Sequence, residues 1–279
     1  MQKTFDIDGP AEIDVRLASG EIVVDPTLAG QIEVELTAHD EESQRLVDDA
    51  RIELNGRNLI VDVPNKRGGF SFSLGFARQG ITCRIRCPHA SGLSVRSKSA
   101  DLVARGVLGG LKVSTASGDI EANRIEGGVN IKSASGDTRV HEVVGGVNVQ
   151  TASGDIEVDI VHGAANVNSA SGDVTIGEAY DDVSANTVSG DQVHGAVLRG
   201  AVSAHSVSGD VTIGVRRGSK VYLDCNTVSG DTVSELELTT DAPAGDGPLV
   251  EIRAKTVSGD IRITRAAAPV PNDTQEVHA

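Results

Sequence analysis

The sequence predicts an all-β protein: a single-stranded β-solenoid (β-helix) of about nine coils with an 18-residue period, plus an N-terminal β cap. Three observations support this prediction. Ser-Gly-Asp occurs eight times, with steps of 18, 18, 18, 18, 19, 21 and 29 residues. The positions around it hold small or β-branched residues, which favour strands. Only 2% of the 279 residues are aromatic, so the core must be thin, and units this short must stack to bury one.

Alignment of the copies on their aspartate reveals columns of apolar residues. They stand eight and six positions before the Asp, as in Val147 and Val149, and one and three positions after it, as in Ile156 and Val158. A third column stands three positions before the Asp and comprises Ala116, Ala134, Ala152, Ala170, Val188, Val207, Val228 and Val257. We expect all these columns to face the core.

The motif itself has two interpretations. Residues 151–158 alternate polar with apolar, which indicates a strand and requires a corner between Gln150 and Thr151. Gly and Asp are also turn residues, so Ser-Gly-Asp alternatively forms a turn. Both interpretations give a rod about 40 Å long, because stacked coils lie about 4.8 Å apart. The glycine pairs at 109–110, 127–128 and 145–146 mark a second corner.

The chain divides into three regions. Residues 1–90 form an N-terminal β-rich cap region, residues 91–265 the β-solenoid of Ser-Gly-Asp repeats, and residues 266–279 a disordered tail. Within the cap region, residues 13–24 read as a diverged coil around Ala18-Ser19-Gly20-Glu21, residues 40–50 as a short helix and residues 55–58 as a hairpin turn. A cap is expected because an open solenoid end exposes strand edges and core.

Charge and hydropathy restrict the partners and the location. The 40 acidic against 25 basic residues give a net charge of −15, which argues against nucleic acid and anionic membrane surfaces. No apolar run reaches the roughly 18 residues of a membrane span, and the first 25 residues lack a signal-peptide core. We therefore expect a cytoplasmic protein without a membrane span, and a surface role stays open.

The sequence predicts no enzyme and no catalytic residue. The seven His stand in different columns, so stacking does not gather them into a metal site. A serine repeated eight times is not a nucleophile motif, since a catalytic serine is a single residue with a base beside it. Cys83 and Cys87 lie roughly 13 Å apart along one strand, too far for a disulfide. Together with Cys225 they are interpreted as small buried hydrophobes.

The repeat is expected to form ladders of like side chains. Stacking places nine aspartates in one file: Asp101, Asp119, Asp137, Asp155, Asp173, Asp191, Asp210, Asp231 and Asp260. Neighbouring carboxylates would repel by about 1 kcal/mol in water-like dielectric. Either Ser hydroxyls and backbone N–H groups compensate this charge, or cations bind between the coils. Calcium suits such oxygen ligands, and the sequence indicates no other cofactor.

Two sets of residues are candidate interaction sites. The first is a binding ladder on the repeat, with calcium, if it binds, on Asp119, Asp137, Asp155 and Asp173. The ladder residues are Ser117, Asp119, Ser135, Asp137, Ser153, Asp155, Ser171, Asp173, Ser189 and Asp191. The second is a glycine-rich aromatic and basic loop, which either anchors a partner or plugs the N-terminal end of the rod. Its residues are Lys66, Arg67, Phe70, Phe72, Phe76 and Arg78.

The repeated pattern (V/I)-x-(V/I)-x-(S/T)-(A/V)-S-G-D-(I/V)-x-(V/I), the glycine pairs and the strand ITCRIRC after a basic aromatic stretch resemble one known family. This is the bacterial putative-adhesin family of β-strand-repeat proteins, a domain of unknown function. The resemblance covers residues 1–265 and implies the fold more than an activity. Bactofilins also have a coil of about 18 residues and polymerise end to end, but they lack a regular Ser-Gly-Asp.

We therefore expect a non-catalytic structural or interaction protein. It would be an adhesin-like β-solenoid that presents a repetitive Ser/Thr/Asp face to an unidentified protein or cell-envelope partner. One alternative is a cytoplasmic scaffold that self-assembles into a dimer or filament, resembling bactofilins in coil length. A further alternative is a solenoid that binds cations or polysaccharide along the same face.

Overall fold

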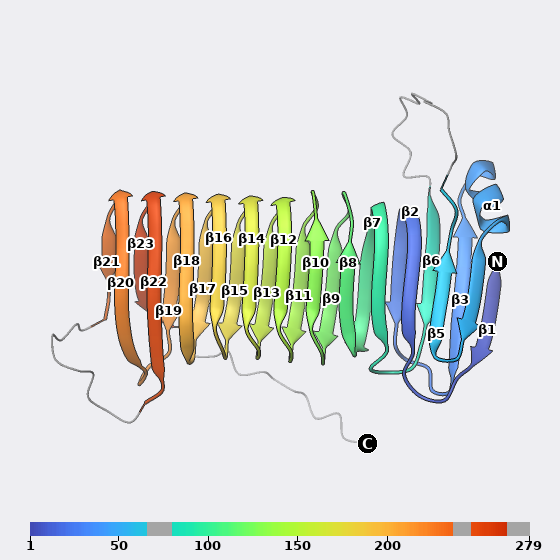
Figure 1. The fold of residues 1–279 in the computed structure, drawn as a ribbon, viewed down its shortest axis with the longest axis horizontal. Helices are drawn as coiled ribbons and strands as arrows, with labels where there is room; N and C mark the ends of the chain where they lie inside the picture. Colours follow the sequence, from blue (N-terminus) through green and yellow to red (C-terminus); the bar gives the residue numbers. More distant parts are fainter. Residues whose placement is uncertain (66–79, 237–246, 267–279) are drawn as a thin grey trace, which may run out of the picture.

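The 18-residue repeat folds into one coil of a flattened β-solenoid, which confirms the predicted fold class (Figure 1). The computed structural model describes residues 1–65, 80–236 and 247–266. Each coil contributes one strand before Ser-Gly-Asp, on what we name the leading face, and one strand after it, on the trailing face. Every strand pairs in parallel with its counterparts in the adjacent coils.

The strands of the two faces have these bounds. The leading face contains β8 (Gly110–Ser114), β10 (Val129–Ser133), β12 (Val147–Ser153), β14 (Ala165–Ser171), β16 (Val183–Ser189), β18 (Gly200–Ser208), β20 (Lys220–Ser229) and β22 (Leu249–Ser258). The trailing face contains β9 (Ile120–Ile125), β11 (Thr138–Val143), β13 (Ile156–Val161), β15 (Val174–Ala179), β17 (Gln192–Val197), β19 (Val211–Val215), β21 (Thr232–Ser234) and β23 (Ile261–Arg265).

The core is a thin layer between the two faces. Its side chains come from the apolar columns eight and six positions before the Asp and one and three positions after it. Val147, Val149, Ile156 and Val158 are each at most 3% exposed. Because most coils repeat these small residues, the core is one continuous apolar cluster along the rod, and it has no room for many aromatic rings.

Ser-Gly-Asp forms a turn, which confirms the turn interpretation and not the strand interpretation. Strand β12 runs unbroken through Gln150 and Thr151 to Ser153, and the corner predicted between Gln150 and Thr151 was wrong. The turn lies at Gly154, whose φ of +117° is open to glycine. The alternation of β12 therefore keeps its phase, with Thr151 on the core side and Ala152 exposed.

The N-terminal region closes one end of the rod. Strands β2 (Glu12–Asp25) and β7 (Gly92–Leu108) each run around a corner as diverged coils, and β5 (Asn58–Asp62) with β6 (Ile81–Arg86) forms a further coil against β2. The outer strands β1 (Gln2–Asp6), β3 (Gln31–Ala38) and β4 (Arg51–Asn55) pair antiparallel. The predicted diverged coil and the hairpin at residues 55–58 are confirmed.

The predicted helix is also confirmed, as α1 (Glu41–Asp48) between β3 and β4. The side chain of Asp40 caps it by accepting hydrogen bonds from the N–H groups of Glu42 and Ser43 at 2.9 and 2.8 Å. Val47 on its inner side is buried. Helix α1 thus covers the N-terminal end of the solenoid (Figure 1).

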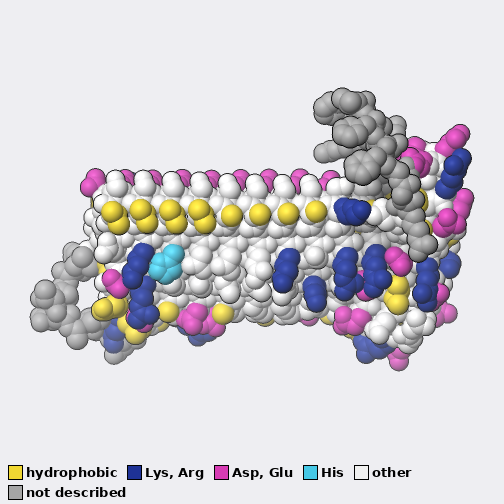
Figure 2. Space-filling view, turned by 45° about the horizontal axis from the view of Figure 1, so that its top comes forward, with side chains coloured by type: hydrophobic (Ala, Val, Ile, Leu, Met, Phe, Trp, Pro, Cys, Tyr) yellow, Lys and Arg dark blue, Asp and Glu magenta, His cyan; other side chains and the backbone are white. Residues whose placement is uncertain are grey.

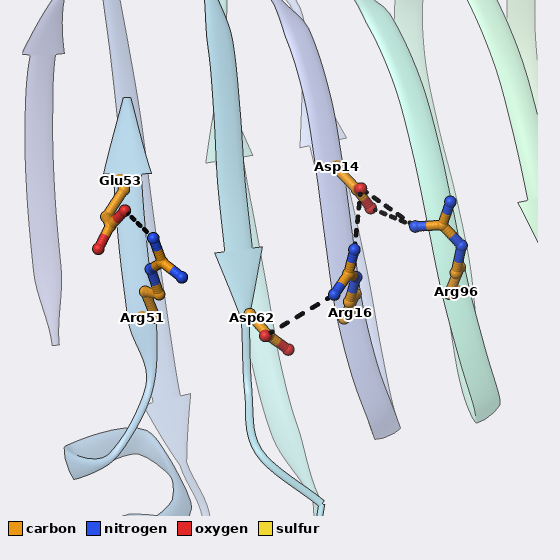
Figure 3. A network of polar contacts seen from close by, with 6 residues as sticks. All are labelled: Asp14, Arg16, Arg51, Glu53, Asp62 and Arg96. Atoms are coloured by element: carbon orange, nitrogen blue, oxygen red, sulfur yellow. Dashed lines mark hydrogen bonds and ion pairs between the residues drawn. The ribbon is translucent and has the colours of Figure 1, made fainter. Parts of the chain in front are cut away.

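Exposed ion pairs link the outer surfaces of the first coils (Figure 3). Arg96 on β7 contacts both carboxylate oxygens of Asp14 on β2 at 3.0 Å. Arg16, also on β2, lies 3.6 Å from Asp14 and 4.0 Å from Asp62 on β5. Because the arginines are about half exposed, each pair contributes at most about 1 kcal/mol.

The last two coils do not stack in sequence order. Strands β22 and β23 lie between β18–β19 and β20–β21, so the final coil in the sequence is the second to last in space. The inserted coil carries Ile252, Ile261 and Ile263, all fully buried. The outer coil has Thr232 and Ser234 in register with Ile261 and Ile263, and such polar residues suit an end position.

The described chain ends at Ala266, whose N–H group donates to the carbonyl of Val215; residues 267–279 of the predicted tail lie outside the described residues. In the part of the chain that the structure describes, no helix has the length and hydropathy required to cross a membrane.

Candidate functional site

The predicted aspartate file runs along the corner between the two faces. The backbone N–H group of every Asp after Asp101 donates to Oδ1 of the Asp in the adjacent coil, at 2.8–3.0 Å. The file therefore contains eight such bonds in the order Asp101, Asp119, Asp137, Asp155, Asp173, Asp191, Asp210, Asp260 and Asp231. The expected compensation by backbone N–H groups is confirmed.

The Thr or Ser column four positions before the Asp faces the core, not solvent. Thr151 donates its hydroxyl hydrogen bond to the carbonyl of Ser153 at 2.9 Å, and Ser169 does the same to Ser171 at 3.0 Å. These hydroxyls satisfy the corner carbonyls, and Ser169 is buried. The predicted Ser/Thr/Asp face was therefore wrong in its Thr component.

The column three positions before the Asp is exposed, although it was expected in the core. Its valines are large exposed hydrophobic residues: Val188 at 55%, Val207 at 49%, Val257 at 49% and Val228 at 80%. In earlier coils the same position is an exposed alanine. Figure 2 shows this row of hydrophobic side chains running along the rod, parallel to a row of acidic ones.

Three exposed columns thus share one edge of the rod, and we name them together the corner ladder. They are the Ala or Val, the Ser and the Asp of each repeat. All ten residues of the predicted binding ladder lie on it, from Ser117 and Asp119 to Ser189 and Asp191, and the Ser members are exposed. The valine column is the part that sequence reasoning missed.

A shallow groove follows the aspartate file on the trailing face. Its lining includes Asp119, Asp137 and Asp155 of the file together with Glu121 and Glu157. Its lining also includes Arg139, whose guanidinium lies 2.7 Å from Glu157. The groove is therefore predominantly acidic, and cationic groups are the chemistry that its charge favours.

Within residues 1–65, 80–236 and 247–266, no group of three or more His, Cys, Asp or Glu residues is arranged to hold a metal ion. One oxygen of each inner aspartate already accepts a backbone hydrogen bond, which leaves the second oxygen for other ligands. Calcium on Asp119, Asp137, Asp155 and Asp173 stays a prediction.

Replacing one aspartate separates the two roles of the file. We expect Asp155→Ala to lower the free energy of unfolding by about 1 kcal/mol, because the N–H group of Asp173 loses its acceptor. Asp155→Asn keeps an oxygen acceptor and removes one charge, so we expect no loss of stability. Urea denaturation of both variants checks this.

Equal stability of the two variants would contradict a structural role for the carboxylate oxygen. The same curves, recorded with excess calcium and with a chelator, test the cation prediction. If calcium binds, it stabilises the wild type, and Asp155→Asn loses part of that gain.

The predicted interaction loop, with Lys66, Arg67, Phe70, Phe72, Phe76 and Arg78, lies outside the described residues. Its two flanks are the ends of β5 and the start of β6. Strand β5 pairs with the part of β2 before Gly20, and β6 pairs with the part that begins at Gly20.

The cysteines match their expected role as apolar residues. Cys83 and Cys87 are buried free thiols, and Cys225 on β20 is a half-buried one. Burial raises the pKa of Cys83 to about 12 and that of Cys87 to about 11. Both thiols therefore remain protonated and unreactive at neutral pH.

The histidines stand in separate surroundings. His141 lies 2.7 Å from Asp159, and His162 lies 3.1 Å from Glu142. His194 is buried in the core with neither ring nitrogen hydrogen-bonded. Burial alone lowers its pKa to about 4, so the ring is neutral at physiological pH.

Comparison with known proteins identifies one family whose model matches this chain. The family model described as Toastrack DUF4097 matches residues 11–264, and no curated protein matches the chain. Among solved structures, the chain is similar to a "putative adhesin" from Bacteroides fragilis NCTC 9343, with 13% identity, a TM-score of 0.47, and 94% of this chain and 96% of that chain covered.

Two structures from Parabacteroides distasonis ATCC 8503 are also similar. One is described as a "putative lipid binding protein", with 15% identity, a TM-score of 0.48, and 95% of this chain and 96% of that chain covered. The other is described as a "putative adhesin", with 15% identity, a TM-score of 0.42, and 94% of this chain and 96% of that chain covered.

Proposed function

This chain belongs to the Toastrack DUF4097 family, and from that premise we propose that it is a non-catalytic interaction module whose corner ladder binds a protein partner. The solenoid acts as a rigid, adhesin-like support, and the ladder supplies the contact surface. The family assignment agrees with the resemblance that the repeat sequence predicted.

The main observation that supports this proposal is the exposure of the valine column. Val188, Val207 and Val257 occupy three adjacent coils and are each about half exposed. Exposed valines in register form a continuous apolar stripe, whereas single exposed hydrophobic residues need no explanation. An apolar stripe beside polar columns is typical of a protein-binding surface.

The chemistry of the ladder specifies the partner. The aspartate column parallels the apolar stripe, and neighbouring carboxylates repeat about every 4.8 Å. A partner with an apolar strip flanked by Lys or Arg side chains would complement both columns at once. Because exposed charges are screened by salt, such a complex weakens as ionic strength rises.

The test compares two triple variants of the same three strands. Val188→Ser, Val207→Ser and Val257→Ser together remove the stripe. The matched control changes the outward residues two positions earlier: Asn186→Ser, His205→Ser and Lys255→Ser. We expect the first variant to lose a partner that the wild type and the control both capture from the native host. Affinity purification with quantitative mass spectrometry checks this.

Thermal stability is the second measurement. Exposed substitutions change the free energy of unfolding by at most about 0.5 kcal/mol each. We expect both triple variants to retain melting temperatures close to the wild type. Equal capture by both variants would contradict binding through the ladder. A large fall in the melting temperature of the valine variant would assign the column a structural role.

A further inference from the structure

The two ends of the rod differ. At the N-terminal end, the edge strands β1 and β4 have five residues each, and α1 covers the core between them. At the C-terminal end, the outermost leading strand is β20, with ten residues. Within the described residues, β20 pairs only with β22, and no described strand lies on its other edge (Figure 1).

Among the residues that the structure describes, the backbone groups on the outer edge of β20 have no partner strand. The N–H group of Lys220 donates to Pro248, toward the rod. Because successive residues of a strand direct their N–H and C=O groups to opposite sides, those of Val221, Leu223 and Cys225 point away from β22. In inner coils, the equivalent residues, such as Leu111, donate to the next coil. An unpaired row of this kind is a template for another strand.

The side chains of the outer coil are also incompletely covered. Val221, Leu223 and Cys225 pack against the core cluster but are only partly buried. Their register partners on β22, Val250, Ile252 and Ala254, are fully buried. Tyr222 on the outer side of β20 is 56% exposed. This strand therefore leaves apolar area in water that a further strand would cover.

The outward side chains of β20 are complementary to themselves. Lys220 and Asp224 lie two positions either side of Tyr222. An antiparallel pairing of two β20 strands, with Tyr222 opposite its own copy, places Lys220 opposite Asp224 at both ends. The same register makes Val221 and Leu223 a hydrogen-bonded pair, which uses the groups that point outward. Shifting the strands to centre on Asp224 would instead oppose two carboxylates.

We infer that two copies of this chain join through their β20 edges, in antiparallel register about Tyr222, to form a closed dimer with two-fold symmetry. The pairing is isologous, since each copy uses the same strand. Growth into a filament would require the short, charged N-terminal edges to accept β20, and the self-complementary charges of β20 favour its own copy. This inference is independent of the corner ladder, which lies along the side of the rod.

Charge reversal tests the register in solution. Asp224→Lys opposes two lysines at each end of the pairing, so we expect a monomer of 28.8 kDa where the wild type has twice that mass. The double variant Lys220→Asp with Asp224→Lys restores opposite charges and is expected to restore the dimer. Light scattering coupled to size exclusion, at low salt and over a range of concentrations, gives the masses.

Cross-linking tests the geometry directly. Tyr222 faces its own copy in a non-hydrogen-bonded pair, where side chains of antiparallel strands are closest. In a Cys225→Ser background, Tyr222→Cys is expected to form an intermolecular disulfide under mild oxidation. Val188→Cys in the same background is the matched control, equally exposed but distant from the end. The native Cys83 and Cys87 are buried and do not interfere.

Three results would overturn the inference. They are a wild type that stays monomeric at every concentration, a dimer that Asp224→Lys does not weaken, and masses that keep increasing with concentration as in a filament. Circular dichroism of each variant shows that it has folded. A monomer that still captures its partner through the corner ladder would remove the dimer and leave the proposed function standing.

Discussion

Replacing Gly154 with alanine is expected to lower the free energy of unfolding by about 3 kcal/mol. Two effects combine at this position. The φ of +117° is a conformation that residues with a Cβ atom rarely adopt. An added Cβ would also lie 2.2 Å from the carbonyl oxygen of Gly136 in the adjacent coil. Because that atom belongs to the backbone, the coils would have to separate, and the Asp155 hydrogen bond to Asp137 would lengthen.

Gly56 provides a control with a positive φ and no crowding. It also has a positive φ, of +63°, but an added Cβ would meet no atom within 4 Å. We expect Gly56→Ala to cost about 1 kcal/mol, which is the conformational term alone. Urea denaturation of both variants gives the values. If Gly154→Ala is no more destabilising than Gly56→Ala, close stacking at the corner does not require glycine.

Stability is expected to fall by about 3 kcal/mol between pH 6.5 and pH 4 through His194 alone. Burial lowers the pKa of this histidine from 6.5 to about 4. Below pH 6.5, the unfolded chain therefore takes up a proton that the folded protein does not. Since the unfolded state binds more protons in this range, acidification favours unfolding. The contribution levels off below pH 4, where the folded state is protonated as well.

The variant His194→Ile isolates this effect from the titration of other groups. Isoleucine occupies the same register position in both neighbouring coils, as Ile176 and Ile213, so the side chain fits its column. It also removes two buried nitrogens without hydrogen-bond partners, which stabilises the protein at neutral pH. The difference in unfolding free energy between variant and wild type should grow as pH falls. A constant difference from pH 7 to pH 4 would contradict the prediction.

The sequence predicted the solenoid because its period is visible without any knowledge of the structure. It misplaced the third apolar column because Ala152 and Val188 are apolar, and apolar side chains were assigned to the core. The phase of the alternation along the strand predicts the observed orientation of these side chains. Continuing the alternation from Val147 and Val149 places Thr151 inside and the next residue outside.

The Ala or Val column is exposed because the threonine before it points inward. A buried strand that ends in a tight turn leaves carbonyl oxygens without partners, and the Thr151 hydroxyl satisfies one of them. This local need outweighs the hydrophobic gain from burying Ala152. The aspartate file was easier to predict, since register alone places equivalent residues in line.

The order of the last coils was not predicted, because the repeat was assumed to stack in sequence order. Steps of 21 and 29 residues, in place of 18, were the signal that extra chain connects these coils. Composition provided a second signal, since Thr232 and Ser234 stand in register with Ile261 and Ile263 of the adjacent coil. In an end coil, one side of such polar residues is open to water, which lowers the cost of placing them at core positions.

The insertion of β22 and β23 also determines how the rod can fray. In a solenoid that stacks in sequence order, the last coil has one neighbour and unwinds first, together with the chain end. Here the C-terminal strands are held on both sides, and the outermost coil is internal to the chain. Unwinding must therefore begin from a closed segment whose two ends are both anchored in folded coils. Strands β22 and β23 are thereby protected from the local opening that exposes the last elements of a chain to proteolysis.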